Sequence, residues 1–322
     1  MMHKKLALVT GITGQDGAYL SKLLLAENYT VVGLTRSLKS SNVTGLQYLN
    51  IESQIELIEC DLLDISQIIH IISKYQPTEI YNLAAQSSVS LSFSQPIGTV
   101  HFNVLSVINI LEAIRIKDKQ IKFYQASSSE MFGNINNLPI TEESVLHPQS
   151  PYAVSKAAAH WLCSTYRQSY GLYICCGILF NHESYLRNKN FFFKKVITDS
   201  IKISRGELDV LKVGNIDIKR DFGYAPKYVE AMHKMMQLDV PSDYLICSGT
   251  SVSLRDIISY IFERLQIPQH KLIIDQDLFR PAEIEDIYGS ADNLKKGLEW
   301  DYSLDYKGLV DIILEEQMRE GK

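Results

Sequence analysis

A glycine-rich turn near the amino terminus constrains the fold more than any other feature of the chain. Residues 10–17 read T-G-I-T-G-Q-D-G, directly after the apolar segment 6–9 and before a helical pattern. Gly11 permits a tight turn, Gly14 lets the backbone approach a pyrophosphate, and Gly17 permits close packing of helix on strand. A helix that begins there presents free N–H groups to phosphate. The turn therefore predicts a parallel α/β sheet that binds a dinucleotide.

Short apolar segments alternate with helical patterns through the first half of the chain. Strands are predicted at 6–9, 30–34, 55–59, 79–83 and 121–126, and helices at 17–26, 65–74 and 100–116. Such alternation implies parallel βαβ units in a doubly wound sheet. Strands that are apolar throughout agree with a sheet covered on both faces.

After about residue 180 the pattern changes to short strands mixed with helices at 196–205, 226–237 and 254–265. We therefore expect an α/β protein with two parts. Residues 1–180 would form the dinucleotide-binding domain, and residues 181–322 a smaller mixed α/β carboxyl-terminal lobe that binds the substrate. We expect the chain to cross between the two.

Composition excludes several classes of protein. Of 322 residues, 46% are apolar and 21% charged, as in ordinary globular proteins. A formal charge of −5 argues against a general nucleic-acid binder. No apolar run approaches the roughly 20 residues that span a bilayer, and no signal peptide is evident. The five cysteines form no CxxC pair and the histidines no metal-binding pattern, so we expect reduced thiols, no metal and a cytoplasmic location.

The end of the second predicted strand distinguishes the two nicotinamide cofactors. An acidic residue there binds the 2′-hydroxyl of NAD, whereas the 2′-phosphate of NADP needs a cation. The chain has Arg36 and no acidic residue at this point, which predicts NADP. Asp61 and Leu62 follow the third strand and could hold the adenine, although Asp61 could instead cap the next helix.

Four residues form a candidate catalytic set. Tyr152 and Lys156 are four apart, so on a helix they share one face. A cation beside a phenol favours the phenolate, which can exchange a hydroxyl proton. Ser128 lies at the end of the fifth strand and could donate to a substrate oxygen. Glu130 could remove a carbon-bound proton beside a ketone, a step that a simple dehydrogenase does not need.

The chain resembles the extended short-chain dehydrogenase/reductase family of nucleotide-sugar enzymes, and within it the GDP-mannose 4,6-dehydratases. The similar segments span nearly the whole chain and lie at 10–17, 81–87, 123–133, 150–156, 177–184, 220–223 and 279–283. The glycine turn and Tyr-x-x-x-Lys are shared across the superfamily. Asn-His-Glu-Ser at 181–184 and Arg-Pro-Ala-Glu at 280–283 are narrower signatures.

The resemblance implies a Rossmann-type fold, a GDP-sugar substrate and an internal NADP redox cycle that yields a 4-keto-6-deoxy sugar. It implies catalysis by Ser128, Glu130, Tyr152 and Lys156. The glycine turn and the resemblance together give as cofactor contacts Gly11, Thr13, Gly14, Gln15, Asp16, Gly17, Arg36, Asp61, Leu62, Leu83, Ala85, Tyr152, Lys156 and His182. The implied substrate contacts are Ser87, Asn181, Lys195, Gly214, Asn215, Arg220, Arg280 and Glu283. We expect a homodimer or homotetramer without nucleic-acid or membrane partners.

Two departures from the family leave alternatives open. The stretch after Arg36 and the carboxyl-terminal lobe are shorter than in many GDP-mannose dehydratases. Both features also suit an NADPH-dependent reductase of a GDP-4-keto-6-deoxy sugar, or a dehydratase acting on a GDP-manno-heptose. An epimerase is a weaker alternative. A non-catalytic NADP sensor is disfavoured because Ser128, Tyr152 and Lys156 are all present.

Overall fold

A seven-stranded parallel sheet forms the centre of the computed structural model, which describes residues 5–320. The strand order is β10-β6-β5-β4-β1-β2-β3, and every neighbouring pair is parallel. The strands are β1 (Leu6–Thr10), β2 (Thr30–Thr35), β3 (Glu56–Glu59), β4 (Glu79–Asn82), β5 (Lys122–Ser128), β6 (Ile174–Leu179) and β10 (Tyr244–Ile246). The order reverses between β1 and β4, and parallel sheets bind ligands at the carboxyl ends of the strands beside such a reversal.

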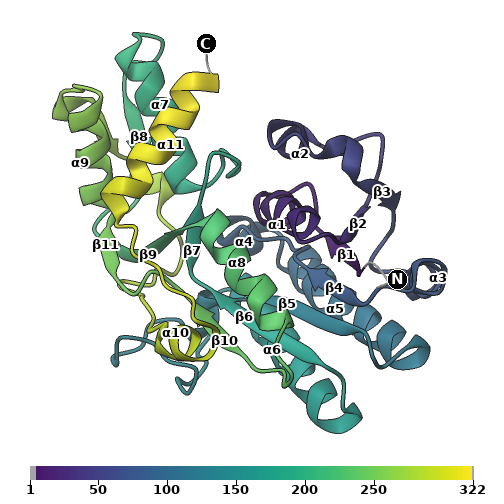
Figure 1. Ribbon diagram of the computed structural model, residues 1–322. Helices are drawn as coiled ribbons and strands as arrows, with labels where there is room; N and C mark the ends of the chain where they lie inside the picture. Colours follow the sequence, from purple (N-terminus) through teal and green to yellow (C-terminus); the bar gives the residue numbers. More distant parts are fainter. Residues whose placement is uncertain (1–4, 321–322) are drawn as a thin grey trace.

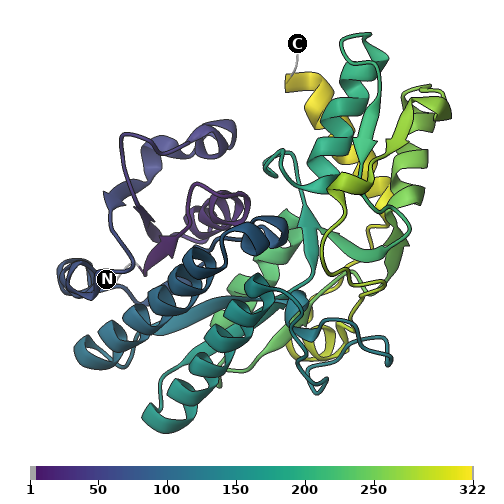
Figure 2. The same ribbon diagram turned by 180° about the vertical axis from the view of Figure 1, so that it is seen from behind.

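Helices cover both faces of this sheet (Figure 1). One face carries α1 (Gln15–Ala26) and α8 (Ala225–Met236), and the other carries α3 (Ile65–Tyr75), α5 (Pro96–Lys117) and α6 (Pro151–Tyr170). Figure 2 shows α5 and α6 running side by side. Successive residues of β1 face opposite layers, since Ala7 and Val9 pack with α1 whereas Leu8 packs with α3 and α5. Burial on both sides explains why the strands are apolar throughout.

The expected doubly wound α/β architecture is confirmed. Every strand and helix predicted before residue 130 forms, with ends displaced by a few residues. Helix α5 begins at Pro96 rather than residue 100, because proline suits the first turn of a helix. The short elements α2 (Thr44–Tyr48), η1 (Glu52–Gln54) and α4 (Val89–Ser94) were not predicted, since a single turn of helix has no clear periodicity.

Helix α5 corrects one expectation. By length and composition it could cross a membrane, because its mean hydropathy is 1.5 over an 18-residue window. The expectation that no segment is apolar enough to span a bilayer is therefore wrong for this helix. Scattered polar residues interrupt its apolar runs without making it polar on average. Val107, Ile110, Leu111 and Ile114 are buried in the core shared with α3 and the sheet, and a helix that covers a sheet needs such a composition.

The second half of the chain forms a smaller lobe above the carboxyl ends of the large sheet. Its strands are β7 (Asn181–Glu183), β8 (Leu211–Val213), β9 (Lys219–Tyr224), β11 (Ser251–Ser253) and β12 (Leu272–Ile274). Its helices are α7 (Phe192–Ser204), α9 (Leu254–Arg264), η3 (Gln269–Lys271), η4 (Gln276–Leu278) and α11 (Tyr306–Glu320), whereas α10 (Asp292–Leu298) packs against α8 and β10 of the large sheet. The chain crosses back between β9 and β11, where α8 and β10 join the large sheet. The domain boundary at residue 180 stays a prediction.

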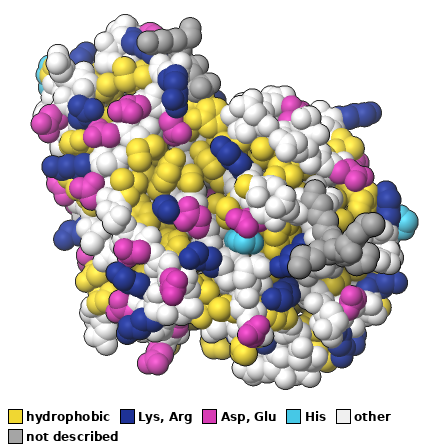
Figure 3. Space-filling model, viewed as in Figure 1, with side chains coloured by type: hydrophobic (Ala, Val, Ile, Leu, Met, Phe, Trp, Pro, Cys, Tyr) yellow, Lys and Arg dark blue, Asp and Glu magenta, His cyan; other side chains and the backbone are white. Residues whose placement is uncertain are grey.

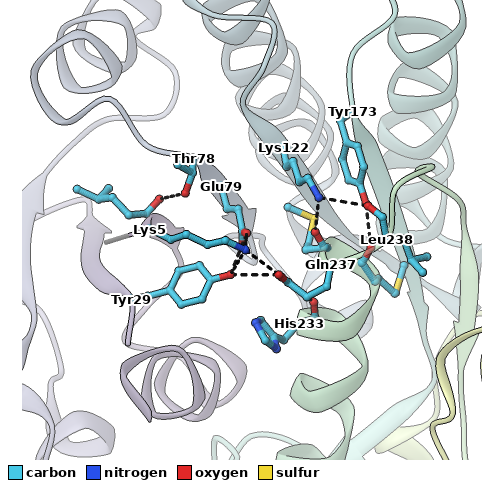
Figure 4. A network of polar contacts seen from close by, with 12 residues as sticks. Lys5, Tyr29, Thr78, Glu79, Lys122, Tyr173, His233, Gln237 and Leu238 are labelled. Atoms are coloured by element: carbon cyan, nitrogen blue, oxygen red, sulfur yellow. Dashed lines mark hydrogen bonds and ion pairs between the residues drawn. The ribbon is translucent and has the colours of Figure 1, made fainter. Parts of the chain in front are cut away.

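A polar network at the amino-terminal ends of β1 and β4 stabilises a buried carboxylate (Figure 4). The Glu79 side chain accepts hydrogen bonds from Tyr29 Oη at 2.9 Å and from Tyr81 Oη at 2.8 Å. Lys5 Nζ lies 3.5 Å from Glu79 Oε1 and donates to Gln237 Oε1 at 2.8 Å. A buried charge is tolerated only when it is paired and hydrogen-bonded, so these partners join the sheet to the end of α8.

A second group of donors in Figure 4 completes the end of α8. Lys122 Nζ donates to the carbonyl oxygens of Met236 at 2.8 Å and Leu238 at 3.2 Å, and Tyr173 Oη donates to Leu238 O at 2.8 Å. A cation beside the last carbonyls satisfies acceptors that the helix leaves free and complements its dipole. Helix α8 is therefore anchored to the large sheet, although it follows β9 of the small lobe in the chain.

We expect Gly17→Ala to lower the free energy of unfolding by about 1–3 kcal/mol, the usual cost of overpacking. An added Cβ would lie 2.4 Å from Gly11 O and 2.5 Å from Ile12 Cα, both backbone atoms. Urea denaturation followed by circular dichroism measures the change. Gly98→Ala is the matched control, because nothing lies within 4 Å of its added Cβ. Unchanged stability of Gly17→Ala would contradict the close packing described here.

Candidate active site

The carboxyl ends of the parallel strands open into a cavity of about 1020 Å³. Its walls come from the glycine turn, the ends of β2, β4 and β5, the start of α6 and the facing side of the small lobe. All of the residues that the sequence assigned to the cofactor line this cavity, as do Ser128, Glu130, Tyr152 and Lys156. Its volume stands at the upper end of the roughly 300–1,000 Å³ range of small-molecule sites.

The glycine turn forms a cradle at the switch point of the sheet. Gly11 has a φ of +66°, and a Cβ there would lie 2.8 Å from Ala84 N. Gly14 precedes α1 in extended conformation and has no side chain that could cap the helix. The first N–H groups of α1 therefore keep their hydrogen-bonding capacity for a ligand. Together with the positive end of the helix dipole, they fit the pyrophosphate of a dinucleotide.

Asp16 and His182 line the cavity but also bind each other. His182 Nε2 lies 2.9 Å from Asp16 Oδ2, and Gln15 Nε2 donates to His182 O at 3.1 Å. Burial opposes ionisation of Asp16, but the charge of His182 and its hydrogen bond outweigh this and lower the pKa of the Asp16 carboxyl to about 2. The pair joins the first turn of α1 to β7 of the small lobe. The sequence did not predict this contact.

A chain of polar side chains links the ends of three strands. Thr10 Oγ1 donates to Asn82 Oδ1 at 2.6 Å, and Asn82 Nδ2 donates to Gln125 Oε1 at 2.8 Å. Thr10 Oγ1 also accepts from the backbone N–H groups of Leu83 and Ala84 at 3.1 Å. The sequence reading did not single out Thr10, Asn82 or Gln125. Polar residues at the ends of otherwise apolar strands are the signal that could have indicated them.

The four candidate catalytic residues meet where β5 runs into η2 (Ser129–Phe132) and α6 begins. The Ser128 hydroxyl accepts from Glu130 N at 3.3 Å and lies close enough to the Tyr152 phenol to affect its titration. Lys156 Nζ lies 5.9 Å from the centre of the Tyr152 ring and donates to Ala126 O at 2.7 Å. The arrangement places a hydroxyl, a phenol, an ammonium group and a carboxylate around one end of the cavity.

Burial shifts the titration of both members of the Tyr-x-x-x-Lys pair. It raises the pKa of the Tyr152 phenol to about 12, against the opposing effect of the nearby Ser128 hydroxyl. It lowers the pKa of the Lys156 ammonium to about 8, with the nearby acidic groups opposing. At neutral pH the pair is therefore a neutral phenol beside a mostly charged ammonium group, which can return a proton to a substrate oxygen and can take one when the phenolate is stabilised.

Asn103, a residue that the sequence analysis did not predict, joins α6 to α5 and to the loop after β4. Asn103 Nδ2, on α5, donates to Ser155 Oγ at 2.9 Å and to Gln86 O at 3.1 Å. Asn103 Oδ1 accepts from Gln86 N at 2.8 Å. Ser155 lies between Tyr152 and Lys156 in the sequence, so these bonds fix both residues relative to the loop after β4.

The small lobe contributes a buried cation to the cavity. Arg220 is 5% exposed, and its Nη1 donates to Ile284 O at 2.6 Å. Among the described residues Nη2 has no hydrogen-bond partner, and Glu283 Oε2 is 3.8 Å away. Burial lowers the pKa of the guanidinium, with the charge of Glu130 opposing. A buried cation with a free donor fits an anionic ligand such as a diphosphate.

The predicted substrate residues divide into two groups. Ser87, Asn181, Arg220 and Arg280 line the cavity, whereas Lys195, Gly214, Asn215 and Glu283 lie outside its wall. Lys195 Nζ donates to Lys212 O at 2.6 Å, and Asn215 Oδ1 accepts from Asp217 N at 3.1 Å. A Cβ at Gly214 would lie 2.7 Å from Leu278 O. A substrate role stays a prediction for all eight residues.

Arg36 and Asp61 lie at the other end of the cavity, beyond β2 and β3. Arg36 is exposed, so its guanidinium can reach a ligand without a desolvation cost. The alternative that Asp61 caps the following helix is wrong, because Asp64 is the N-cap of α3 and accepts from Ser66 N at 2.9 Å. Asp61 Oδ1 instead accepts from Leu63 N at 3.0 Å, within its own turn.

The surface charge agrees with a small-molecule site. On the face seen in Figure 3, the basic and acidic side chains of the described residues are interspersed rather than gathered by sign. A protein that binds nucleic acid through its backbone phosphates usually presents a basic stripe or patch. The described cations with a clear ligand-binding geometry are instead those that line the cavity.

Comparisons with known proteins give a consistent result. The sequence profile of the GDP-mannose 4,6 dehydratase family matches residues 8–313. GDP-mannose 4,6 dehydratase 1 of Arabidopsis thaliana is 39% identical over 331 residues, which cover 99% of this chain and 91% of that protein. The GDP-mannose 4,6-dehydratase of Sinorhizobium fredii is 36% identical over 343 residues, which cover 99% and 98% of the two.

Solved structures show the same fold. RMD from Pseudomonas aeruginosa, in complex with NADPH, is 25% identical with a TM-score of 0.83 and covers 98% of this chain and 100% of that chain. UDP-glucose 4-epimerase from Thermotoga maritima has a TM-score of 0.87 at 20% identity, with the same coverage. The family expected from the motifs is confirmed, and the chain belongs to the GDP-mannose 4,6-dehydratase family of extended short-chain dehydrogenases/reductases.

Proposed function

We propose that this protein is an NADP-dependent GDP-sugar 4,6-dehydratase. The observation that carries the proposal is that Glu130 shares one cavity with the Tyr152–Lys156 pair. A dehydratase needs the phenol to exchange a hydroxyl proton and a carboxylate to remove a carbon-bound proton. Reduction of a ketone requires only the first of these groups. Relatives that are 36–39% identical over nearly the whole chain carry the name GDP-mannose 4,6-dehydratase, which supports the same activity.

Each side chain has a distinct task in this reaction. Tyr152, assisted by Lys156, takes the proton of the C4 hydroxyl, and Ser128 orients that oxygen. A ketone at C4 acidifies the hydrogen on C5, which Glu130 removes as the C6 hydroxyl leaves as water. A bound nicotinamide cofactor supplies hydride acceptance from C4 and hydride return to C6. Glu130 returns that proton to C5, and the proton that Tyr152 took from the C4 hydroxyl passes to the departing C6 hydroxyl to complete the water, so the protein ends each cycle unchanged.

The substrate in this proposal is GDP-mannose or a GDP-manno-heptose. Arg220 and Arg280 are the cations that the small lobe contributes to the cavity, and they suit a diphosphate. Ser87 and Asn181 lie in the same wall and could bind sugar hydroxyls. The alternative function, reduction of a GDP-4-keto-6-deoxy sugar with NADPH, is favoured by the short stretch after Arg36. A cytoplasmic location and a homodimer or homotetramer remain predictions.

Incubation with GDP-mannose and no added reductant tests the proposal directly. A dehydratase releases a product lighter by one water and leaves its cofactor in the starting oxidation state. The same assay with GDP-manno-heptose distinguishes the two substrates. Reduction of a supplied GDP-4-keto-6-deoxy sugar by NADPH, with no dehydration of either GDP-sugar, would favour the reductase.

Replacement of Arg36 by alanine tests the cofactor. We expect NADP to bind about 10- to 150-fold more weakly, because a hydrogen bond to a charged group contributes roughly 1.5–3 kcal/mol. NAD should bind with nearly unchanged affinity. Fluorescence titration measures both constants. Lys39→Ala is the control, since Lys39 is an exposed cation of the same loop outside the cavity wall. Tighter binding of NAD than NADP by the unmodified protein would refute this assignment.

Tyr152→Phe removes the phenol oxygen and keeps the ring. Turnover should fall by about 10²–10⁴-fold, the usual contribution of general acid–base catalysis, while the thermal midpoint changes little. Tyr166→Phe, on the same helix, removes a hydroxyl that donates to Glu112 Oε1 at 2.7 Å far from the four catalytic candidates. It should keep its activity. Near-normal turnover of a folded Tyr152→Phe protein would show that another group moves the proton.

Glu130→Gln separates dehydratase from reductase. The amide keeps the size of the side chain but cannot act as a base, whereas Tyr152 and Lys156 still permit oxidation at C4. The variant should accumulate reduced cofactor and a 4-keto sugar that retains its C6 oxygen. It should also lose exchange of the C5 hydrogen with deuterated water.

Near-ultraviolet absorbance and product mass provide these measurements. Glu143→Gln, which changes an exposed carboxylate outside the cavity, is the control and should dehydrate the substrate normally. Full water loss and rapid C5 exchange in Glu130→Gln would exclude Glu130 as the base.

A further inference from the structure

A cluster of metal-ligating side chains lies behind the active site, between α6 and the β6–β10 edge of the sheet. The ligand atoms of His160, Cys176 and Asp243 all lie within 4.8 Å of one another. The buried Cys163 thiol lies beside the Cys176 thiol. The four residues come from α6, β6 and the segment before β10, so no spacing in the sequence predicted them. We propose that His160, Cys163, Cys176 and Asp243 form a tetrahedral binding site for a divalent cation of the zinc class.

The residue types match that class of cation. Two thiolates, one imidazole and one carboxylate form a donor set that suits zinc and disfavours magnesium or calcium. His160 and Cys163 are three apart on α6 and therefore share one face of the helix. A tetrahedral zinc ion with bonds of about 2.0–2.3 Å holds its ligand atoms roughly 3.3–3.8 Å apart, so the ligand atoms of His160, Cys176 and Asp243 need to approach one another by about 1 Å.

The orientation of His160 is that of a metal ligand. Its Nδ1 lies 3.1 Å from Ser127 Oγ, on the side away from the cluster. Its Nε2 faces Asp243 Oδ2 at 4.0 Å. A histidine that binds a metal through one nitrogen usually donates its other N–H to an oxygen, which fixes the tautomer and the ring. The Ser127 hydroxyl supplies that oxygen.

Arg167 completes the charge balance of the site. It donates to both oxygens of Asp243, and its Nη2 lies 3.9 Å from Cys176 Sγ. A divalent cation, two thiolates, the Asp243 carboxylate and the Arg167 guanidinium sum to no net charge. A coordinating cation favours the thiolate form of a buried cysteine.

A divalent cation can reach this site from solvent, and once bound it would link α6 to the edge of the sheet. His160, Cys163 and Cys176 are buried, whereas the Asp243 side chain is 21% exposed at the edge of the sheet. Ions would therefore enter past Asp243. A bound ion would join α6, which carries Tyr152 and Lys156, to β6 and to the segment before β10. Its role would be to stiffen the support of the active site without contacting substrate.

Cobalt binding tests the proposal without any mutation. The reduced, chelator-treated full-length protein is titrated with Co²⁺ and, separately, with Zn²⁺. We expect one ion per chain, a strong visible band typical of tetrahedral Co²⁺ and a near-ultraviolet band from thiolate coordination. Zinc should displace cobalt and raise the thermal midpoint, whereas Mg²⁺ should do neither. Absence of the thiolate band at saturating Co²⁺ would overturn the proposal.

Two neighbouring cysteines provide a matched pair of variants. Cys176 faces α6, whereas Cys175 is equally buried but faces α8. Cys176→Ala should lose the bound ion and the thiolate band, and Cys175→Ala should keep both. Circular dichroism establishes that each variant is folded. Equal metal content in the two folded variants would place the ion elsewhere, and the unmodified protein's Co²⁺ spectrum decides the question if Cys176→Ala does not fold.

Discussion

The close approach of backbone to backbone in the glycine turn is the constraint on which the rest of the site depends. At Gly17 no side chain fits between α1 and the backbone of Gly11 and Ile12. This contact sets the direction of α1, and with it the direction of the N–H groups that no side chain caps. Asp16 then reaches His182 from the same first turn, so the turn that cradles a phosphate also ties the small lobe to the sheet.

The parallel sheet assembles the site from separate segments because all of its strands end at one edge. β1 brings the glycine turn, β5 brings Ser128 and the loop that carries Glu130, and α6 brings Tyr152 and Lys156. Polar groups within a buried sheet must be hydrogen-bonded. The bonds among side chains at the ends of β1, β4 and β5 meet this requirement and hold these ends in register. The supporting bonds are thus made before any ligand binds, as expected of a preorganised site.

Burial holds the side chains of the site in fixed positions and also disfavours their charged forms. It raises the pKa of Tyr152 to about 12 and lowers that of Lys156 to about 8. Arg220 is buried, and its Nη2 has no hydrogen-bond partner among the described residues. Each of these groups is only partly stabilised by the protein, because hydrogen bonds to Ala126 O and Ile284 O replace only some of the water that burial removes. A site of this kind favours ligands whose own charges complement it.

Local sequence determined the fold class and the part of the cavity wall that the glycine turn, the strand ends and the Tyr152–Lys156 pair form. The glycine turn, the alternation of strand and helix, and the spacing of Tyr152 and Lys156 are short-range features whose geometry a few residues specify. Contacts between distant segments were decided by tertiary structure alone. Asp16 and His182 lie 166 residues apart, and His160 meets Cys176 and Asp243 only once α6 packs on β6 and β10 joins the edge. Neither spacing nor residue type predicts such meetings, because strand pairing and helix packing determine which side chains end up within bonding distance.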